Sequence, residues 1–265
     1  MSFSILLIGA GQLGSRYLQG LATCETLLEI FVIDPNEKSL ESAQLRWEEE
    51  ASGNILHTVL FSQTLEKISS DIDLCLVTTT ADVRLSVVEQ VLSRCRVWYW
   101  VLEKVLAQFV GHINRLEQLL LNAEGAWVNT PRRSNSWHQQ IYEQLPRKQS
   151  WQVIGSGGAW GMACNSIHFI DLIAWWTDEE LVSVDAAGLE KWFPSKRNGF
   201  CEVSGKLQMN YSGGSQLELS ADESNTPFSL TLQNERGSWQ LDEFDGKFTN
   251  SSGFSLAGKV EESSL

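Results

Sequence analysis

The residues with the clearest chemical potential are three glycines near the start of the chain. Gly9, Gly11 and Gly14 follow an apolar run, Ile5 to Ile8, in the spacing G-x-G-x-x-G, and a helical pattern comes after them. In dinucleotide-binding folds the first glycine makes the tight strand-to-helix turn, and the second lets the backbone approach a pyrophosphate. The third lets the helix and strand pack closely. Glycines at this spacing also occur by chance in turns, so the motif needs supporting context.

An acidic residue supplies that context. A second apolar run, Ile30 to Ile33, ends in Asp34, which lies twenty positions after Gly14. A carboxylate at this distance accepts hydrogen bonds from the ribose hydroxyls of NAD and repels the 2′-phosphate of NADP. We therefore predict a dinucleotide site that prefers NAD to NADP. The alternative is an acidic turn, Asp34-Pro35-Asn36, that is unrelated to the glycines.

Two further groups follow predicted strands. Thr78-Thr79-Thr80 closes one apolar run, and Glu103-Lys104 closes another. The ligand crevice of a parallel sheet lies outside the carboxyl ends of its strands, so both groups are candidates for cofactor contact. The alternatives are a helix N-cap formed by a threonine or Asp82, and a solvated turn at Glu103-Lys104.

Polar side chains also interrupt an apolar helical pattern in the second half of the chain. Asn165, His168 and Asp171 recur at i, i+3 and i+6 and form one stripe. Such a stripe must be satisfied by partners or line a cavity, whereas a histidine there alone would more often be a hydrogen-bonded core residue. Arg132 and Arg133 could meet an anionic substrate group, but we favour surface charges for both.

The predicted elements would position these residues at one edge of a sheet. In the first half, apolar runs that read as strands alternate with helical patterns, which predicts a right-handed, doubly wound parallel sheet. We assign it to a Rossmann domain, residues 1–125. The predicted strands are 5–8, 30–33, 55–61, 73–78 and 97–102, and the helical patterns include 37–51, 83–92 and 109–121.

The second half, residues 126–265, predicts an α+β domain. A short strand at 126–129, a helix at 135–145, a strand at 151–155 and a helix through 164–176 precede a region that alternates apolar and polar residues from position 181 onward. This alternation predicts an open, mostly antiparallel sheet with one apolar face, and the open face is a candidate dimer surface. The glycine-rich segment 155–161 lacks the Lys-Ser/Thr of a P-loop.

The composition narrows the class of protein. The 265 residues are 43% apolar and 20% charged, with 20 basic against 33 acidic side chains and a net charge of −13. This balance argues against nucleic acid or an anionic membrane surface as a partner. The sequence shows no signal peptide, membrane span, C-x-x-C pair or metal-ligand cluster, so we expect a cytoplasmic protein without a metal.

In combination and order these motifs resemble the Gfo/Idh/MocA oxidoreductases, which include glucose–fructose oxidoreductase and inositol dehydrogenase. The resemblance rests on the segment from Gly9 to Gly14, on Asp34, on Thr78 to Thr80, on Glu103-Lys104, and on His168 to Asp171. It implies a Rossmann domain followed by an α/β domain whose large open sheet mediates a homodimer or homotetramer.

The resemblance also implies a reaction, in which hydride passes between a nicotinamide and a hydroxyl or keto carbon of a sugar, cyclitol or nucleotide-linked sugar. It makes Lys104 and His168 the acid/base pair, and a cationic nicotinamide favours the neutral form of a neighbouring amine. Substrate contacts are expected at Lys104, Asn165, His168 and Asp171. Cofactor contacts are expected at Gly9, Gly11, Gln12, Leu13, Gly14, Asp34, Thr78, Thr79, Thr80, Glu103 and Lys104.

The sequence departs from the family pattern at three positions. Val105 replaces a proline, Arg84 stands where a histidine is common, and Cys164 stands where many members have aspartate. A thiol replaces a carboxylate in proton transfer only with a matched pKa. The chain is also short for the family, mainly in the sheet domain. The alternative is therefore a catalytically silent NAD(P)-binding sensor or scaffold of the same fold, although the presence of both Lys104 and His168 favours an enzyme.

Overall fold

The computed structural model describes residues 2–51, 56–68 and 71–258. The chain divides into two compact units, Met1–Asn129 and Thr130–Leu265. The division falls after residue 129 and not after residue 125, because the strand β6 (Gly125–Asn129) pairs in parallel with β5 (Val97–Glu103) of the first unit. The start of the strand predicted at 55–61 lies outside the described residues.

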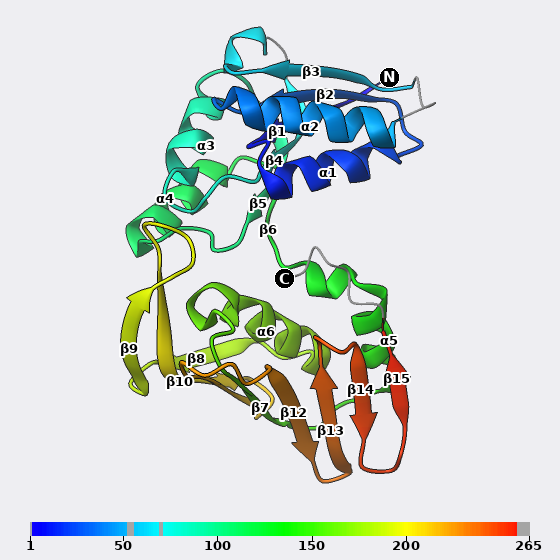
Figure 1. The fold of residues 1–265 in the computed structure, drawn as a ribbon, viewed down its shortest axis with the longest axis vertical. Helices are drawn as coiled ribbons and strands as arrows, with labels where there is room; N and C mark the ends of the chain where they lie inside the picture. Colours follow the sequence, from blue (N-terminus) through cyan, green and yellow to red (C-terminus); the bar gives the residue numbers. More distant parts are fainter. Residues whose placement is uncertain (1, 52–55, 69–70, 259–265) are drawn as a thin grey trace. The chain divides into compact units, whose positions relative to one another are not determined.

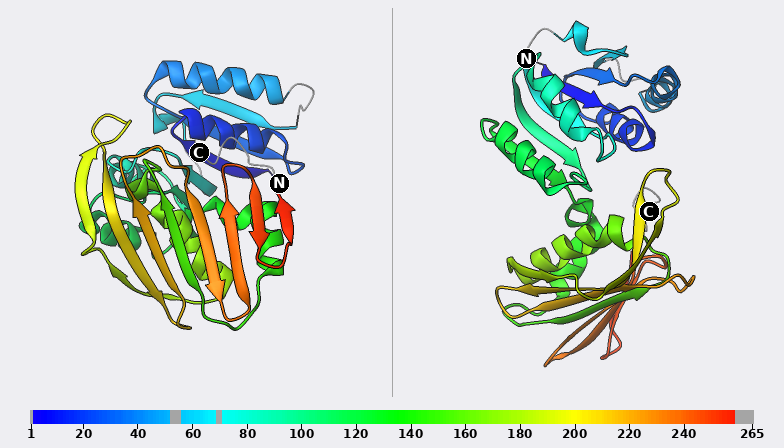
Figure 2. Two further views of the ribbon diagram at one scale, coloured as in Figure 1. Left: turned by 60° about the horizontal axis from the view of Figure 1, so that its bottom comes forward. Right: turned by 90° about the vertical axis from the view of Figure 1, so that its left-hand side faces the viewer.

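The first unit is a six-stranded parallel sheet with the order β3-β2-β1-β4-β5-β6. Helices α1 and α2 lie on one face and α3 and α4 on the other (Figures 1 and 2). The doubly wound sheet is thus confirmed, and its order reverses between β1 and β4, where ligands bind in such sheets. The remaining elements are β1 (Phe3–Ile8), α1 (Gln12–Ala22), β2 (Leu28–Ile33), α2 (Glu37–Glu50), β3 (Thr58–Ser62), β4 (Ile72–Val77), α3 (Arg84–Leu92) and α4 (Val110–Leu120), with a 3-10 turn at Leu65–Lys67.

The strands of this sheet are apolar because helices cover both faces. Leu6 and Leu7 on β1 are fully buried, as is Leu18 on α1. Leu13, an expected cofactor contact, is 38% exposed. The buried side of α1 begins at Gly14, where the missing side chain lets the helix approach the end of β1.

The second unit is built on a nine-stranded mixed sheet with the order β15-β14-β13-β12-β7-β11-β10-β8, and β9 pairs with β10. Strand β7 lies in its interior, parallel to β11 and antiparallel to β12. Helix α6 packs against β10 and β11. The elements are the 3-10 turn η2 (Pro131–Ser134), α5 (Ser136–Gln144), β7 (Gln152–Gly157), α6 (Met162–Thr177), β8 (Leu181–Asp185), β9 (Leu189–Pro194), β10 (Cys201–Tyr211), β11 (Gln216–Ala221), β12 (Ser229–Asn234), β13 (Gly237–Asp242), β14 (Lys247–Asn250) and β15 (Ser255–Ala257).

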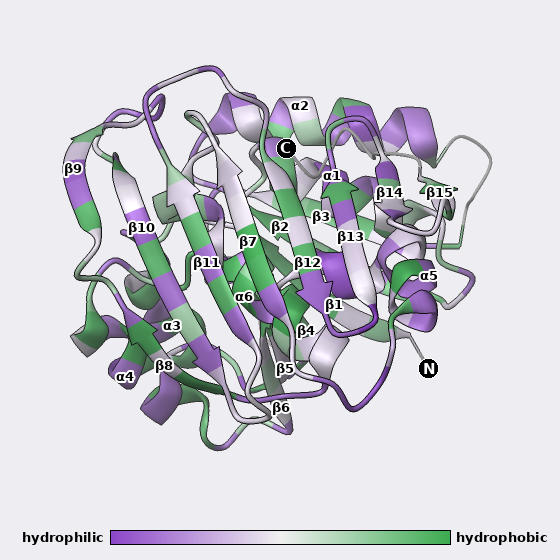
Figure 3. Ribbon diagram, turned by 90° about the horizontal axis from the view of Figure 1, so that it is seen from below, coloured by the Kyte–Doolittle hydropathy of each residue, from purple (hydrophilic) through white to green (hydrophobic). Residues whose placement is uncertain are grey.

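The predicted alternation in this sheet is confirmed. Its inner face is buried at Met209, Leu217, Leu219, Leu230 and Trp239, among others. In Figure 3, hydrophilic and hydrophobic residues alternate along the strands of this sheet. Ile154 is an exposed apolar side chain on the outer face, whereas the exposed Val184 and Trp192 pair with the buried Met209 and Val203 and therefore share the inner face. Association through the outer face stays a prediction. Across the described ranges, no helix is long and apolar enough to cross a membrane.

The glycine-rich segment at the end of β7 serves close packing. A Cβ at Gly155 would lie 2.6 Å from the Leu219 side chain, and one at Gly158 would lie 2.0 Å from the Ser224 carbonyl oxygen. Larger residues would push neighbouring strands apart. These contacts account for the glycines without a phosphate ligand.

A buried charged cluster joins η2 and α5 to the turn after β13. Arg132 donates from Nε (2.7 Å) and Nη2 (2.6 Å) to the two carboxylate oxygens of Glu243, and His138 Nε2 lies 3.1 Å from Glu243 Oε1. The Arg132 guanidinium also stacks on the Phe169 ring at 4.6 Å. Arg132 is only 9% exposed, so the surface interpretation of this residue was wrong. Its partner comes from a distant turn, and a side chain paired in this way can be buried.

This cluster makes the free energy of unfolding depend on pH in the acid range. Burial by itself opposes the charged form of Glu243, but hydrogen bonds from His138 and Arg132 outweigh it and lower its pKa from 4.5 to about 2. The folded pKa lies below the unfolded one, so the stabilisation is complete above pH 4.5 and is lost as the pH falls toward 2. We expect the free energy of unfolding to fall by about 3 kcal/mol over this window, and the melting temperature to fall with it.

The measurement is thermal unfolding followed by circular dichroism across this pH window. Glu243→Gln should lower stability at neutral pH and flatten the acid dependence. Glu223→Gln is the matched control, because this carboxylate forms an exposed pair with Lys191 and should leave the slope unchanged. An equal slope in the wild type and Glu243→Gln would show that Glu243 does not set the acid response.

Candidate functional site

The loop after β1 requires two of its three glycines for steric reasons. Gly9 has φ +97°, a conformation that side chains disfavour, and its added Cβ would lie 3.0 Å from Thr78 Oγ1. A Cβ at Gly14 would lie 1.8 Å from the Gly9 carbonyl oxygen. These are the turn and close-packing roles that the spacing predicts for the first and third glycines.

Gly11 differs, because among the described residues nothing beyond its own chain neighbours lies within 4 Å of its added Cβ. It is the N-cap of α1, and no side chain caps that helix end. The first backbone N–H groups of a helix have no partner within the helix, and they carry the positive end of its dipole. Open space in front of such N–H groups suits a pyrophosphate. The geometry of Gly9, Gly11 and Gly14 therefore fits a dinucleotide.

Asp34 holds the loop after β2 against the glycine loop. One carboxylate oxygen accepts from Ala10 N at 2.7 Å, and the other accepts from Asn36 N at 2.8 Å. Each oxygen has a second lone pair, so the group keeps capacity for a ribose hydroxyl. A pocket of about 240 Å³ lies beside it and is lined by Ala10, Gly11, Gln12, Ser15, Lys38, Ser39, Ser42 and Arg46.

Arg46 from α2 lines this pocket and binds two other lining residues, Gln12 and Ser15. Its Nη2 donates to Gln12 Oε1 at 2.8 Å, and its Nη1 donates to Ser15 Oγ. Gln12 is thus held by a side-chain partner that the sequence did not reveal. The pocket contains the cations of Lys38 and Arg46 as well as hydroxyl groups, so its chemistry favours a polar or anionic ligand.

The three threonines after β4 have different surroundings. Thr78 Oγ1 lies 2.6 Å from the Gly9 carbonyl oxygen, to which it donates, and 3.0 Å from that of Ile8. It therefore supports the glycine loop. Thr79 Oγ1 is buried and has no hydrogen-bond partner in the described ranges, so it has the capacity to bond to a ligand. Helix α3 is capped at Val83 without a side-chain bond, so the N-cap alternative for the threonines and Asp82 is wrong.

Glu103, at the end of β5, is buried and accepts two hydrogen bonds. Tyr17 Oη donates to its Oε1 at 2.6 Å, and Asn129 Nδ2 donates to the same atom at 2.7 Å. Burial and then the carboxylate raise the pKa of Tyr17, so the phenol keeps its proton and remains a donor. Within the first unit the Glu103 carboxylate thus connects β5 to α1 through Tyr17 and to β6 through Asn129. Its contact with a cofactor stays a prediction.

Lys104 follows Glu103 directly and is half-buried. The peptide bond between Lys104 and Val105 is cis. Lys104 stands at the carboxyl end of β5, the edge of the sheet that also carries the glycine loop and the threonines. The structure thus brings Gly9, Asp34, Thr78 and Lys104 to one edge of the first unit, as the sequence predicts.

Arg84 occupies the position where the family resemblance leads one to expect histidine. It is 1% exposed. Its guanidinium donates to the carbonyl oxygens of Val105, Leu106 (2.9 Å) and Thr79. Burial lowers the pKa of Arg84 to about 10, against attraction to Glu103 and Asp82 that raises it, so the side chain is charged at neutral pH. No local sequence pattern indicates a buried cation at this position.

In the second unit, α6 carries the remaining candidates. Gly161 starts the helix with φ +79°, and Glu202 Oε2 accepts from Ala163 N at 2.9 Å. Asn165 Nδ2 donates to the Trp160 carbonyl at 2.9 Å. His168 is buried at 6% exposure, whereas Cys164 is exposed in the first turn. The substrate contacts predicted at Asn165 and His168 stay predictions.

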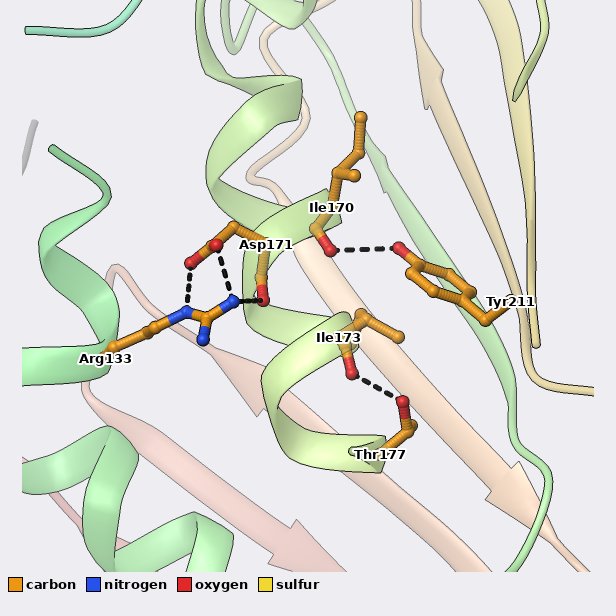
Figure 4. A network of polar contacts seen from close by, with 6 residues as sticks. All are labelled: Arg133, Ile170, Asp171, Ile173, Thr177 and Tyr211. Atoms are coloured by element: carbon orange, nitrogen blue, oxygen red, sulfur yellow. Dashed lines mark hydrogen bonds and ion pairs between the residues drawn. The ribbon is translucent and has the colours of Figure 1, made fainter. Parts of the chain in front are cut away.

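Asp171 forms an ion pair that the sequence did not predict. Arg133 Nε and Nη2 each lie 2.7 Å from one of its carboxylate oxygens, and Nη2 also lies 3.3 Å from its carbonyl oxygen (Figure 4). The Arg133 side chain is 44% exposed, so its surface position agrees with the prediction. Both Asp171 carboxylate oxygens are thus engaged by Arg133. Substrate binding by this carboxylate stays a prediction.

No group of three or more potential metal ligands occurs among the residues that the structure describes. The fit to a dinucleotide rests on the open face of Gly11, on the uncapped start of α1 and on the buried Thr79 hydroxyl.

Comparison with known proteins places the chain in a fold class. No protein-family model matches the sequence, and no curated protein matches it either. The structure, however, shares its two-unit fold with solved dehydrogenases of the Gfo/Idh/MocA type, which confirms the fold that the resemblance implies. Identities to the solved structures below are under 20%, so the likeness establishes the fold alone.

Three solved structures illustrate the similarity. GenD2 from gentamicin A biosynthesis, in complex with NAD, has a TM-score of 0.70 at 14% identity, and the matched region covers 98% of this chain and 81% of the GenD2 chain. Myo-inositol dehydrogenase from Lactobacillus casei, with NAD(H) and myo-inositol, has a TM-score of 0.64 at 18% identity and coverages of 91% and 74%. The WlbA dehydrogenase from Chromobacterium violaceum, with NADH and UDP-GlcNAcA, has a TM-score of 0.63 at 17% identity and coverages of 90% and 73%.

Proposed function

We propose that this protein is an NAD-dependent oxidoreductase of the Gfo/Idh/MocA type that acts on a hydroxyl or keto carbon of a sugar, cyclitol or nucleotide-linked sugar. The observation that carries the proposal is the glycine loop, in which Gly9 and Gly14 are sterically required while Gly11 faces open space. The structural neighbours that contain NAD(H) together with myo-inositol or UDP-GlcNAcA support the cofactor and the substrate class.

In this proposal the chain orients the cofactor and manages the proton. The backbone at Gly11 and the start of α1 receive the pyrophosphate, and Asp34 receives the adenosine ribose. A nicotinamide held there would supply the hydride acceptor for oxidation of the substrate carbon. Lys104 accepts the proton of the substrate hydroxyl, so alcohol oxidation yields a carbonyl group. His168 holds that hydroxyl, and each role reverses for reduction.

The experiment that tests the proposal is a turnover screen. The purified protein is mixed with NAD and a panel of sugars, cyclitols and UDP-sugars, and NADH formation is followed by absorbance. We expect turnover with at least one member of the panel. NADH binding without turnover across the panel would instead support the second candidate, a silent NAD-binding protein. The exposed Cys164 in the first turn of α6 is the observation that favours this alternative.

The cofactor preference can be tested at Asp34. We expect the wild type to bind NADH at least about tenfold more tightly than NADPH, because the carboxylate accepts ribose hydroxyls and repels a phosphate. Asp34→Ala should weaken NADH and remove the preference. Both dissociation constants are measured by fluorescence titration.

Lys38→Ala is the control for this measurement. It removes a cation from the neighbouring pocket and should weaken NADPH more than NADH. Equal affinity of the wild type for both cofactors would refute the role given to Asp34.

A further inference from the structure

The guanidinium of Arg84 joins two loops of the first unit. Arg84 Nη1 donates to the carbonyl oxygens of Val105 and Leu106, and Nη2 donates to that of Thr79. The first two acceptors follow β5, and the third follows β4. These strands are neighbours in the sheet, so Arg84 connects two adjacent loops at its carboxyl edge.

The chemistry of arginine makes this connection rigid. Its planar guanidinium presents donors in a fixed fork, so bonds to both loops constrain their relative position. The side chain is 1% exposed, which removes competing water and strengthens each bond. A buried cation is costly to keep, and here its hydrogen bonds to the described residues go to neutral carbonyl groups, while Glu103 and Asp82 attract it electrostatically.

Lys104 lies between two such constraints. The residue before it, Glu103, is held by Tyr17 and Asn129, and the two residues after it are held by Arg84. The Thr79 loop at the other end of the Arg84 bridge carries the buried hydroxyl without a partner in the described ranges. A bridge of this kind would fix the lysine relative to the loop expected to contact the cofactor.

We propose that Arg84 is a positioning residue, which holds Lys104 and the Thr79 loop in the geometry that hydride transfer requires. This inference rests on the proposed function. It adds to that function a residue that touches neither substrate nor cofactor. Small displacements of a reacting group lower rates by about 100-fold, so the effect should fall on turnover more than on binding.

The test compares Arg84→Ala and Arg84→Lys with Val91→Ala. Val91 is fully buried on the same helix, and its apolar side chain cannot hydrogen-bond to either loop, so Val91→Ala controls for lost stability. We expect Arg84→Ala to lower kcat about 100-fold while KM and the NADH dissociation constant stay within about threefold. Arg84→Lys should be intermediate, and millimolar guanidinium should restore part of the Arg84→Ala activity. Val91→Ala should lower the melting temperature and keep kcat.

A second measurement does not depend on turnover. Amide hydrogen exchange is followed in residues 79–82 and 104–109 of the proteins without substrate. Arg84→Ala should accelerate exchange in both loops, and Val91→Ala should not. Unchanged exchange in both loops, or unchanged kcat, would overturn the inference. If the wild type turns over no substrate in the screen, the proposed function fails, and hydrogen exchange alone decides the role of Arg84.

Discussion

Lys104→Ala should reduce kcat by about 1,000-fold or more, while the dissociation constant for NADH stays within about threefold of wild type. General acid–base groups contribute about 10²–10⁴-fold to rates, and Lys104 is the proposed proton acceptor. The lysine stands at the carboxyl end of β5, after a glutamate that is fixed by two hydrogen bonds. The measurement combines steady-state kinetics, with the substrate found in the turnover screen, and NADH titration.

Two variants make this result specific. Lys104→Arg keeps the positive charge but cannot release a proton at neutral pH, so it should be as inactive as Lys104→Ala. Lys206→Ala removes an exposed lysine that pairs with Glu218 on the sheet, and it should leave turnover and stability unchanged. Substantial activity in Lys104→Arg would mean that the charge of this residue matters and its proton does not.

Much of the fold could be predicted because local patterns carry it. Apolar strands alternating with amphipathic helices define the parallel sheet, and the period of two from residue 181 onward defines the open one. The interior position of β7 between β11 and β12 could not be predicted, since strand order depends on long-range pairing. The same reason explains why β6, predicted as the start of the second domain, belongs to the first sheet.

The candidate site, like the fold, could be predicted from the sequence only in part. Gly9, Gly11, Gly14 and Asp34 have a spacing that reflects their chemistry, so the sequence reveals them. The polar partners are revealed only by the fold, because they are far apart in the chain. Asn129 is 112 positions from Tyr17, and Glu243 is 111 positions from Arg132. Arg84 binds carbonyl groups, which leave no mark in a sequence.

The second large effect is expected at Gly11. Apart from its local backbone, a methyl group at Gly11 or at Gly20 would meet none of the described residues within 4 Å, so both alanine variants should fold. Gly20 lies within α1, where alanine stabilises a helix by about 0.5–1 kcal/mol. Gly11 faces the place proposed for the pyrophosphate, so its methyl group should exclude the cofactor and weaken NADH binding at least about 30-fold, or about 2 kcal/mol.

The most direct test of the dinucleotide site is therefore calorimetric titration of NADH into three proteins, the wild type, Gly11→Ala and Gly20→Ala, with thermal unfolding recorded for each. We expect the wild type and Gly20→Ala to bind NADH with the same affinity, and Gly11→Ala to remain folded while it loses binding. Equal binding by all three proteins, or no binding by the wild type, would contradict the assignment of this loop to a nicotinamide cofactor.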